Sequence, residues 1–248
     1  CIVGETGSGK SILLLAILHL LPENAIVTGE AFFEGEDLIR MKRRQLDKIR
    51  GARISYVPQG SGNGLNPLLT VGLQVAEPMI EHQKVKKKEA IAEAVRLMKR
   101  FHIGDEEKVA GQYPFTYSGG MKQRAMIAMG IIAGADMILA DEPTKGLDAV
   151  VRNQVYDTFC MVRDQYRVGF IVITHDLLLA RKFCERIVVM YCGRVLETNA
   201  ARELFEHPRH PYTQGLIASL PHLGMKPMAG FSPAFTDQPS GCVFHPRC

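Results

Sequence analysis

Short apolar runs alternate with amphipathic stretches along this chain of 248 residues. Four short runs have the apolar character of strands; the first is bounded by glycines and the second stops at Pro58, while the other two run into polar residues. These runs are Ala31–Phe33, Arg53–Val57, Met137–Ala140 and Phe170–Thr174. Continuous apolar strands that alternate with helices are typical of a buried parallel sheet, so the pattern predicts an α/β fold.

Helical periodicity fills the stretches between the strands. Within Lys88–Phe101 the apolar residues recur on one helix face, which we interpret as core packing. Predicted helices are Ile12–Leu18, read as buried, the charged stretch Asp37–Ile49, Val71–Phe101, a helix from Ser118 to Ala133, and a short helix beyond Ala200. His19 is predicted to be a partly exposed helix residue. Ile187–Tyr191 and Arg194–Glu197 predict a hairpin, and the chain after Pro221 is predicted to be irregular.

Composition narrows the class of protein only a little. Hydrophobic residues make up 46% of the chain and charged residues 23%, as in ordinary globular proteins. The net charge of +4 is too small to indicate nucleic acid by itself. No nucleic-acid partner is predicted. No apolar run reaches the roughly 18 residues that span a bilayer, and no signal peptide is recognisable. The sequence predicts a cytosolic protein, or one bound to a membrane only through a partner.

A phosphate-binding loop opens the chain. The segment consists of Gly4, Glu5, Thr6, Gly7, Ser8, Gly9, Lys10 and Ser11, and it matches G-x-x-x-x-G-K-[ST] without a mismatch. Its glycines let backbone N–H groups turn around a phosphate, while Lys10 suits the β- and γ-phosphates and the Ser11 hydroxyl suits Mg²⁺. The motif predicts a nucleoside triphosphate with Mg²⁺. Since only three residues precede it, we expect the chain to be a fragment at this end, and Cys248 also falls within what reads as an unfinished motif.

Two further segments carry candidate chemistry. The predicted strand Met137–Ala140 runs into Asp141 and Glu142, so one carboxylate can hold Mg²⁺ and the next can polarise an attacking water. Ser118, Gly119 and Gly120 begin a predicted helix and expose N–H groups that suit an anion. Taken alone, this second segment is more typical of an ordinary helix N-cap than of an anion site.

The order of these pieces resembles the nucleotide-binding subunit of ABC transporters over nearly the whole chain. The resemblance implies a P-loop NTPase (RecA-like ABC ATPase) core with an inserted helical subdomain and truncated N-terminal strands. It implies that Gln59 touches Mg²⁺, that Asp141 coordinates the metal, and that Glu142 is the catalytic base. His175 would contact the γ-phosphate and Asp148 would lie in the D-loop. Residues Ser118, Gly119, Gly120 and Met121 would cap ATP on a second ATPase subunit, in a homodimer or heterodimer.

Three segments resemble the peptide/nickel importer branch of that family. They are Met121–Arg124, His210–Leu216 and Gly241–Cys248. Some members of the branch bind an iron–sulfur cluster in such a tail. Cys242 and Cys248 supply only half of a four-ligand site, so we expect a cluster only in a longer native chain. The other thiols, Cys160, Cys184 and Cys192, are interpreted as buried or free cysteines of a cytosolic protein.

The resemblance implies four segments: ATPase core 1–59, helical signature subdomain 60–130, ATPase core 131–199 and importer-type extension 200–248. It implies an ATP-hydrolysing importer subunit on the cytoplasmic face of the membrane, peripheral to permease subunits and served indirectly by an extracellular substrate-binding protein. The cargo, peptide or a nickel chelate, stays open, as does the adenine-stacking residue. The main alternative is a soluble ABC-type ATPase acting on DNA or ribosomes; a third is a module that senses nucleotide without hydrolysis.

Overall fold

The computed structural model describes residues 1–60, 64–104 and 106–248. Ser61, Gly62 and Asn63 of the glycine-rich loop therefore lie outside the described residues. The chain divides into a first unit, Cys1–Ala16 with Ile173–Cys248, and a second unit, Ile17–Val172. The four-segment division made from the sequence stays a prediction.

The first unit is built on strands β1 (Ile2–Val3), β7 (Arg186–Tyr191) and β8 (Arg194–Ala200). β1 pairs in parallel with β7, with Ile2 opposite Val188, and also pairs with Ile173, the last residue of β6 (Gly169–Ile173). β7 and β8 form an antiparallel hairpin with an irregular register between Val189 and Met190. The predicted hairpin is therefore confirmed, and it is the support on which the phosphate-binding loop rests.

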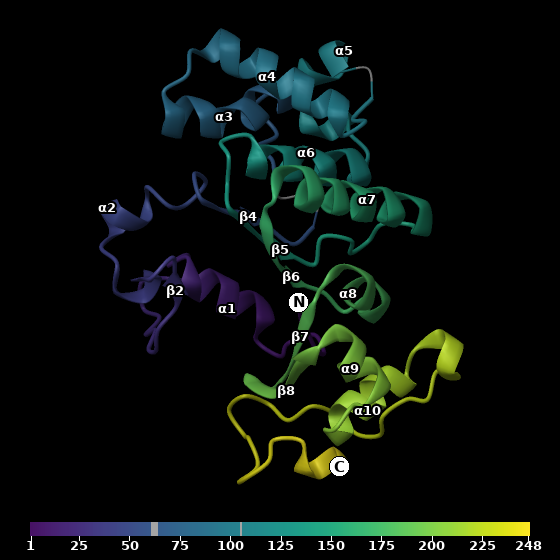
Figure 1. Ribbon diagram of the computed structural model, residues 1–248. Coiled ribbons are helices and arrows are strands. Elements are labelled where there is room, and N and C mark those ends of the chain that lie inside the picture. The colour runs from purple at the N-terminus through teal and green to yellow at the C-terminus, as the bar shows by residue number, and fades with distance from the viewer. Residues whose placement is uncertain (61–63, 105) are drawn as a thin grey trace. The chain divides into compact units, whose positions relative to one another are not determined.

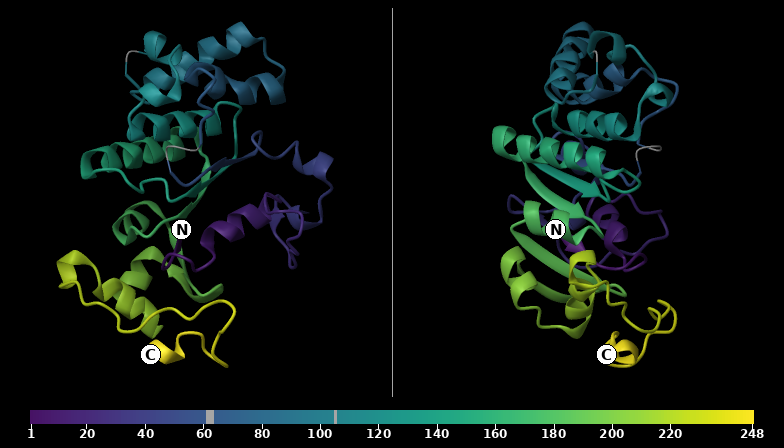
Figure 2. Two further views of the ribbon diagram at one scale, coloured as in Figure 1. Left: turned by 180° about the vertical axis from the view of Figure 1, so that it is seen from behind. Right: turned by 90° about the vertical axis from the view of Figure 1, so that its right-hand side faces the viewer.

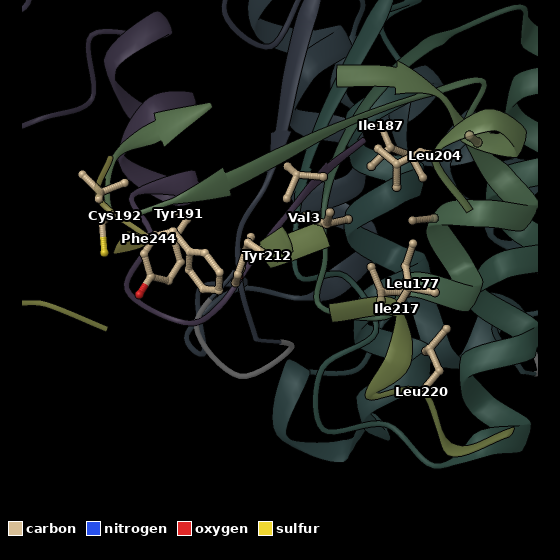
Figure 3. Packing of buried hydrophobic residues seen from close by; sticks show 14 residues of the cluster. Val3, Leu177, Ile187, Tyr191, Cys192, Leu204, Tyr212, Ile217, Leu220 and Phe244 are labelled. Carbon is tan, nitrogen blue, oxygen red and sulfur yellow. The ribbon is translucent and has the colours of Figure 1, made fainter. Parts of the chain in front are cut away.

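Helices α1 (Lys10–Ile17), α8 (Leu177–Phe183), α9 (Ala201–Glu206) and α10 (Pro211–Ala218) accompany these strands. A buried cluster joins β1, β7, α8, α9 and α10 to Val243 and Phe244 near the C-terminus. Figure 3 shows Tyr191, Tyr212 and Phe244 gathered at one side of this cluster and Leu177, Ile217 and Leu220 at the other. The C-terminal region is thus part of the core that holds the start of the chain.

The second unit contains the parallel pair β4 (Ile54–Val57) and β5 (Met137–Asp141), with Ile54 opposite Met137. It also contains the small antiparallel pair β2 (Phe32–Phe33) and β3 (Glu36–Asp37). Ser55 donates from its hydroxyl to the Gly130 carbonyl at 2.6 Å, which ties β4 to the end of a helix. The prediction that the short apolar runs form strands is confirmed at β4, β5 and β6.

Helices make up most of the rest of the second unit. They are α2 (Arg43–Leu46), α3 (Val71–Gln83), α4 (Lys87–Arg100), α5 (Glu106–Ala110), α6 (Gly119–Ile131) and α7 (Ala149–Tyr166). Helices α3 and α4 run side by side and both pack on α6, which packs in turn on α7 and β4 (Figures 1 and 2). The helix face predicted within Lys88–Phe101 is buried at Ala94, Met98 and Phe101.

The structure corrects three local predictions. The stretch Asp37–Ile49 is not one helix, because Met41 and Lys42 are extended between a 3₁₀ turn and α2. The stretch Val71–Phe101 divides at Lys84, whose left-handed backbone (φ 56°) ends α3. His19 lies beyond α1 in a left-handed conformation (φ 51°) instead of within the helix.

The apolar run Ile12–Leu18 is helical to Ile17 but is not buried on all sides. Ile12 is 59% exposed and Leu13 38%, whereas Leu14 and Leu18 are buried. A continuous apolar run does not reveal which side of a helix will be covered, so burial on every face was the wrong expectation. Among the described residues, no helix combines the length and apolar character needed to cross a membrane.

Candidate nucleotide-binding site

Residues Gly4–Gly9 form a tight loop between β1 and α1 in the first unit, and Lys10 and Ser11 begin α1. The Ser8 hydroxyl donates to the Glu5 carbonyl at 2.8 Å. The buried Lys10 ammonium donates to the carbonyl oxygens of Gly4 at 2.9 Å and Glu5 at 2.8 Å, and lies 3.3 Å from Ser8 Oγ. The cation is therefore held within the loop at the N-terminus of α1, where backbone N–H groups and the helix dipole favour an anion.

The β7–β8 hairpin fixes the base of this loop. Gly193 N–H donates to the Ser8 carbonyl at 3.0 Å. Gly4 has φ 151°, and a Cβ added there would lie 2.0 Å from the Met190 carbonyl oxygen of β7. Glycine is therefore needed at the first motif position both for the backbone conformation and for the close approach of two chain segments.

His175 follows β6 and lies in the first unit with the loop. Its neighbour Thr174 is fully buried, and the Thr174 hydroxyl oxygen accepts from Asp176 N–H at 2.9 Å. Asp176 caps α8 by accepting from the N–H groups of Leu178 and Leu179, each at 3.0 Å. These contacts fix the backbone on both sides of His175, which is exposed and so accessible to a ligand.

Asp141 ends β5 in the second unit and is 2% exposed. Its Oδ2 accepts from the Tyr56 hydroxyl at 3.3 Å. Among the described residues, Oδ1 has no hydrogen-bond partner. Burial raises the pKa of Tyr56 to about 12, helped by the charge of Asp141 and the hydrogen bond to it. A buried carboxylate oxygen without a partner is costly, and it is the kind of atom that a hard cation coordinates.

Glu142 directly follows Asp141 and has a left-handed backbone, with φ 47°. This conformation is uncommon for a residue other than glycine, and such residues concentrate at functional sites. The side chain is 8% exposed, and the Glu142 carbonyl accepts from Lys145 N–H at 3.1 Å to close a turn. The turn fixes the backbone that carries the second carboxylate, directly after the strand.

Ser118 caps α6, and its Oγ accepts from Met121 N–H at 3.2 Å. A Cβ on Gly120 would lie 2.2 Å from Cγ1 of Val151, so glycine allows α6 to pack closely on α7. Asp148 caps α7 by accepting from Val151 N–H at 2.9 Å. Ser118 is exposed, as the predicted capping of a second subunit requires, and Asp148 is exposed as well.

The predicted site residues fall into both units. Gly4–Ser11 and His175 belong to the first unit, and Gln59, Ser118–Met121, Asp141, Glu142 and Asp148 belong to the second. Gln59 is exposed, two residues beyond the end of β4. The roles assigned to these residues from the sequence stay predictions.

The predicted metal-binding residues suit Mg²⁺ that is held jointly with substrate phosphates better than they suit a metal ion coordinated only by protein side chains. Magnesium commonly uses one or two carboxylates together with substrate phosphates, and Asp141 Oδ1 meets that need. Within 1–60, 64–104 and 106–248, no group of three or more His, Cys, Asp or Glu side chains could hold a metal ion. Cys242 and Cys248 are both exposed thiols, and an iron–sulfur cluster stays a prediction for a longer chain.

Sequence reasoning missed the contacts that the C-terminal region makes with the loop. The Tyr212 hydroxyl accepts from Glu5 N–H at 2.9 Å, and Arg247 pairs with the Glu5 carboxylate at 3.0 Å. A cavity of about 210 Å³ lies between the loop and the tail, lined by Glu5–Ser8, Tyr191, Cys192 and Ser232–Phe235. The resemblance marked His210–Leu216 and Gly241–Cys248 as family segments but gave them no link to the loop.

A phosphate-binding loop and a strand ending in two carboxylates define a P-loop nucleoside triphosphatase. Residues 1–145 match the ABC transporter family, and residues 196–248 match the C-terminal region of oligopeptide/dipeptide transporters. The oligopeptide transport ATP-binding protein OppD of Haemophilus influenzae is 38% identical, with 100% of this chain and 78% of that protein covered. The dipeptide transport protein DppD of Bacillus subtilis is also 38% identical, with coverage of 100% and 76%.

Solved structures agree with the fold. The ATP-binding cassette MJ0796, solved as a dimer bound to ADP and phosphate after hydrolysis, matches with a TM-score of 0.70 and 30% identity, covering 81% of this chain and 84% of that one. This chain belongs to the ABC transporter family. It is therefore an ATPase with the predicted P-loop NTPase fold, and the DNA- or ribosome-acting alternative receives no support from the comparisons.

Proposed function

We propose that this chain is the ATP-hydrolysing subunit of a peptide importer. One observation carries the proposal: strand β1, which leads into the phosphate-binding loop, shares one buried core with the region matching oligopeptide/dipeptide transporters, since Val3 and Phe244 belong to the same cluster. The relatives OppD and DppD carry peptide transport in their names. Peptides are therefore the preferred cargo, with nickel chelates as the alternative within the same branch.

The chemistry that we assign is hydrolysis of the γ-phosphate of ATP. Lys10 and the N–H groups of Gly7–Ser11 bind the β- and γ-phosphates. Glu142 takes a proton from water as the water oxygen attacks the γ-phosphorus. The bond from that phosphorus to the β–γ bridging oxygen breaks, and ADP and phosphate leave. His175 donates a hydrogen bond to the γ-phosphate. Mg²⁺, when bound by Ser11, Gln59 and Asp141, neutralises phosphate charge.

The exposed Ser118 and the cap of α6 support a site shared between two copies or two related chains. In this proposal, Ser118–Met121 of one subunit bind the γ-phosphate held by the loop of the other. Permease subunits provide the path through the membrane, on whose cytoplasmic face the ATPase is bound peripherally. An extracellular substrate-binding protein delivers the cargo and does not touch this chain.

The test is a Glu142→Gln variant of the full-length chain. We expect steady-state ATP hydrolysis to fall by about 10²- to 10⁴-fold, the usual contribution of a general base, while ATP binding is retained and an ATP-bound dimer accumulates. Glu89→Gln, an exposed glutamate on α4, is the matched control and should leave hydrolysis unchanged. Unimpaired hydrolysis by Glu142→Gln would refute the assignment of Glu142 as the general base. If the chain, reconstituted with its permease subunits, imports no labelled peptide, the assignment of peptides as the cargo is refuted.

A further inference from the structure

Residues 200–248, here called the C-terminal tail, contact Glu5, the second residue of the phosphate-binding loop. The tail binds both the backbone N–H and the side-chain carboxylate of Glu5. The Tyr212 hydroxyl accepts from Glu5 N–H at 2.9 Å. The Arg247 guanidinium donates to both carboxylate oxygens of Glu5, at 3.0 and 3.1 Å. The Ser232 hydroxyl donates to Glu5 Oε2 at 2.6 Å. Three residues far along the chain thus converge on one residue of the loop.

The Arg247 side chain is also held by contacts with residues other than Glu5. Its Nε donates to the Ala229 carbonyl at 3.0 Å, and its Nη1 lies 3.2 Å from the Tyr191 hydroxyl. Its guanidinium carbon lies 5.7 Å from the Tyr191 ring centre and 5.8 Å from that of Phe244. An arginine packed and hydrogen-bonded in this way has little conformational freedom left, so it can hold its partner in a defined position.

The ion pair is shielded from water on the arginine side. The Arg247 side chain is 6% exposed and that of Glu5 is 30%. Burial alone would lower the pKa of Arg247, but the hydrogen bonds to Glu5 and Tyr191 and the Glu5 charge outweigh it and raise that pKa. Removing one partner of a shielded pair leaves the other charge uncompensated, so such a contact matters more than a surface ion pair.

Glu5, which the tail holds in place, also contacts Lys10 directly. The Glu5 carbonyl accepts from the Lys10 ammonium at 2.8 Å and from the Ser8 hydroxyl at 2.8 Å. The tail therefore fixes the side chain and the N–H of the same residue whose carbonyl orients the phosphate-binding lysine. A loop held ready in its binding shape loses less entropy when it binds phosphate.

We propose that Arg247 is a positioning residue for ATP binding and acts through Glu5 to hold the phosphate-binding loop in shape. The inference rests on the proposed function in one respect, that the loop binds ATP. It adds a role for the C-terminal region, which becomes part of the nucleotide site without touching the nucleotide.

A double-mutant cycle on the full-length chain tests this role. The variants are Arg247→Ala, Glu5→Gln and the double variant, each measured for the Kd of a fluorescent ATP analogue with Mg²⁺ and for KM and kcat. We expect Arg247→Ala to raise Kd and KM about tenfold, with kcat changed less than about twofold. In the Glu5→Gln background, Arg247→Ala should add less than about twofold. Arg247→Lys should restore part of the affinity.

The control is Arg202→Ala, which removes a charge from an exposed ion pair with Glu206 within α9. It should change Kd by less than about twofold. A tenfold effect of Arg247→Ala that persists without the Glu5 carboxylate would overturn the proposal, because the arginine would then attract nucleotide by charge alone. So would an unchanged Kd. If Arg247→Ala lowers the melting temperature strongly, Ser232→Ala, which removes one bond to Glu5, should still raise Kd about two- to threefold, and no change would refute the mechanism. A wild-type chain that binds no ATP would refute the proposed function instead.

Discussion

Phe244, next to the buried Val243, packs the C-terminal end of the chain into the core of the first unit, and we predict that Phe244→Ala loosens this end. The side chain is 2% exposed. Its ring centre lies 5.4 Å from those of Tyr191 and Tyr212 and 5.8 Å from that of His210. Two of these rings belong to residues that bond Glu5 or Arg247, so the substitution removes the packing behind the loop contacts.

The expected loss follows from the buried area. A buried phenylalanine removes on the order of 150 Å² from water, worth about 4 kcal/mol at about 25 cal/mol per Å². Measured Phe→Ala changes in cores cost about 3–5 kcal/mol, which agrees. For a chain of this size, each kcal/mol lowers the melting temperature by about 2–4 °C, so we expect a decrease of about 6–20 °C.

Phe231→Ala is the matched control, because Phe231 lies in the same tail but is 95% exposed. It should change stability by less than about 0.5 kcal/mol. Thermal unfolding is followed by calorimetry and by near-ultraviolet circular dichroism, which reports on tyrosine packing here because the chain has no tryptophan. Equal melting temperatures for the two variants would refute the reasoning that the tail is anchored by this ring.

The remaining predictions concern close packing and pH. Gly120→Ala should destabilise the chain by about 1–3 kcal/mol in denaturant unfolding, since its Cβ would lie 2.2 Å from Cγ1 of the stiff Val151 side chain. Gly111→Ala is the control and should be neutral or slightly stabilising, because its Cβ would meet only the Lys108 carbonyl oxygen, at 3.6 Å. Equal losses of stability in the two variants would contradict the predicted clash at Gly120. Burial would raise the pKa of Glu197, but the hydrogen bonds that its carboxylate accepts from the N–H groups of Arg209 and His210 help to lower it overall. A lowered folded-state pKa gives a contribution to stability that is present above the unfolded value, about 4.3, and is lost as the pH falls through the folded value. The free energy of unfolding should therefore fall more steeply below about pH 4.5 for the wild type than for Glu197→Gln, and parallel pH profiles would contradict the shift.

Local signals in the sequence predicted local structure well. The apolar runs at β4, β5 and β6 are strands, and Ser118 caps its helix through Met121 N–H as the pattern Ser-Gly-Gly predicts. Hydrogen bonds and apolar burial within a few residues decide these elements, so a single sequence carries the information.

Predictions failed where distant segments decide the outcome. Nothing near Glu5 in the sequence indicates Arg247, which is 242 residues away. Nothing within Ile12–Leu18 indicates that Ile12 stays 59% exposed. Periodicity could mark a helical stretch over Val71–Phe101 but not the left-handed Lys84 that divides it, because lysine has no strong preference for that conformation.

Asp141 and Glu142 each carry a cost in the structure, one in the side chain and one in the backbone. A buried carboxylate oxygen without a partner costs about 1–3 kcal/mol, and a left-handed residue other than glycine costs about 1–3 kcal/mol. Together they are a substantial part of the 5–15 kcal/mol that stabilises a typical domain. A cation on Asp141 Oδ1 would offset the first cost. Adjacent costs of this kind are expected where a site is arranged for its ligand instead of for the resting fold.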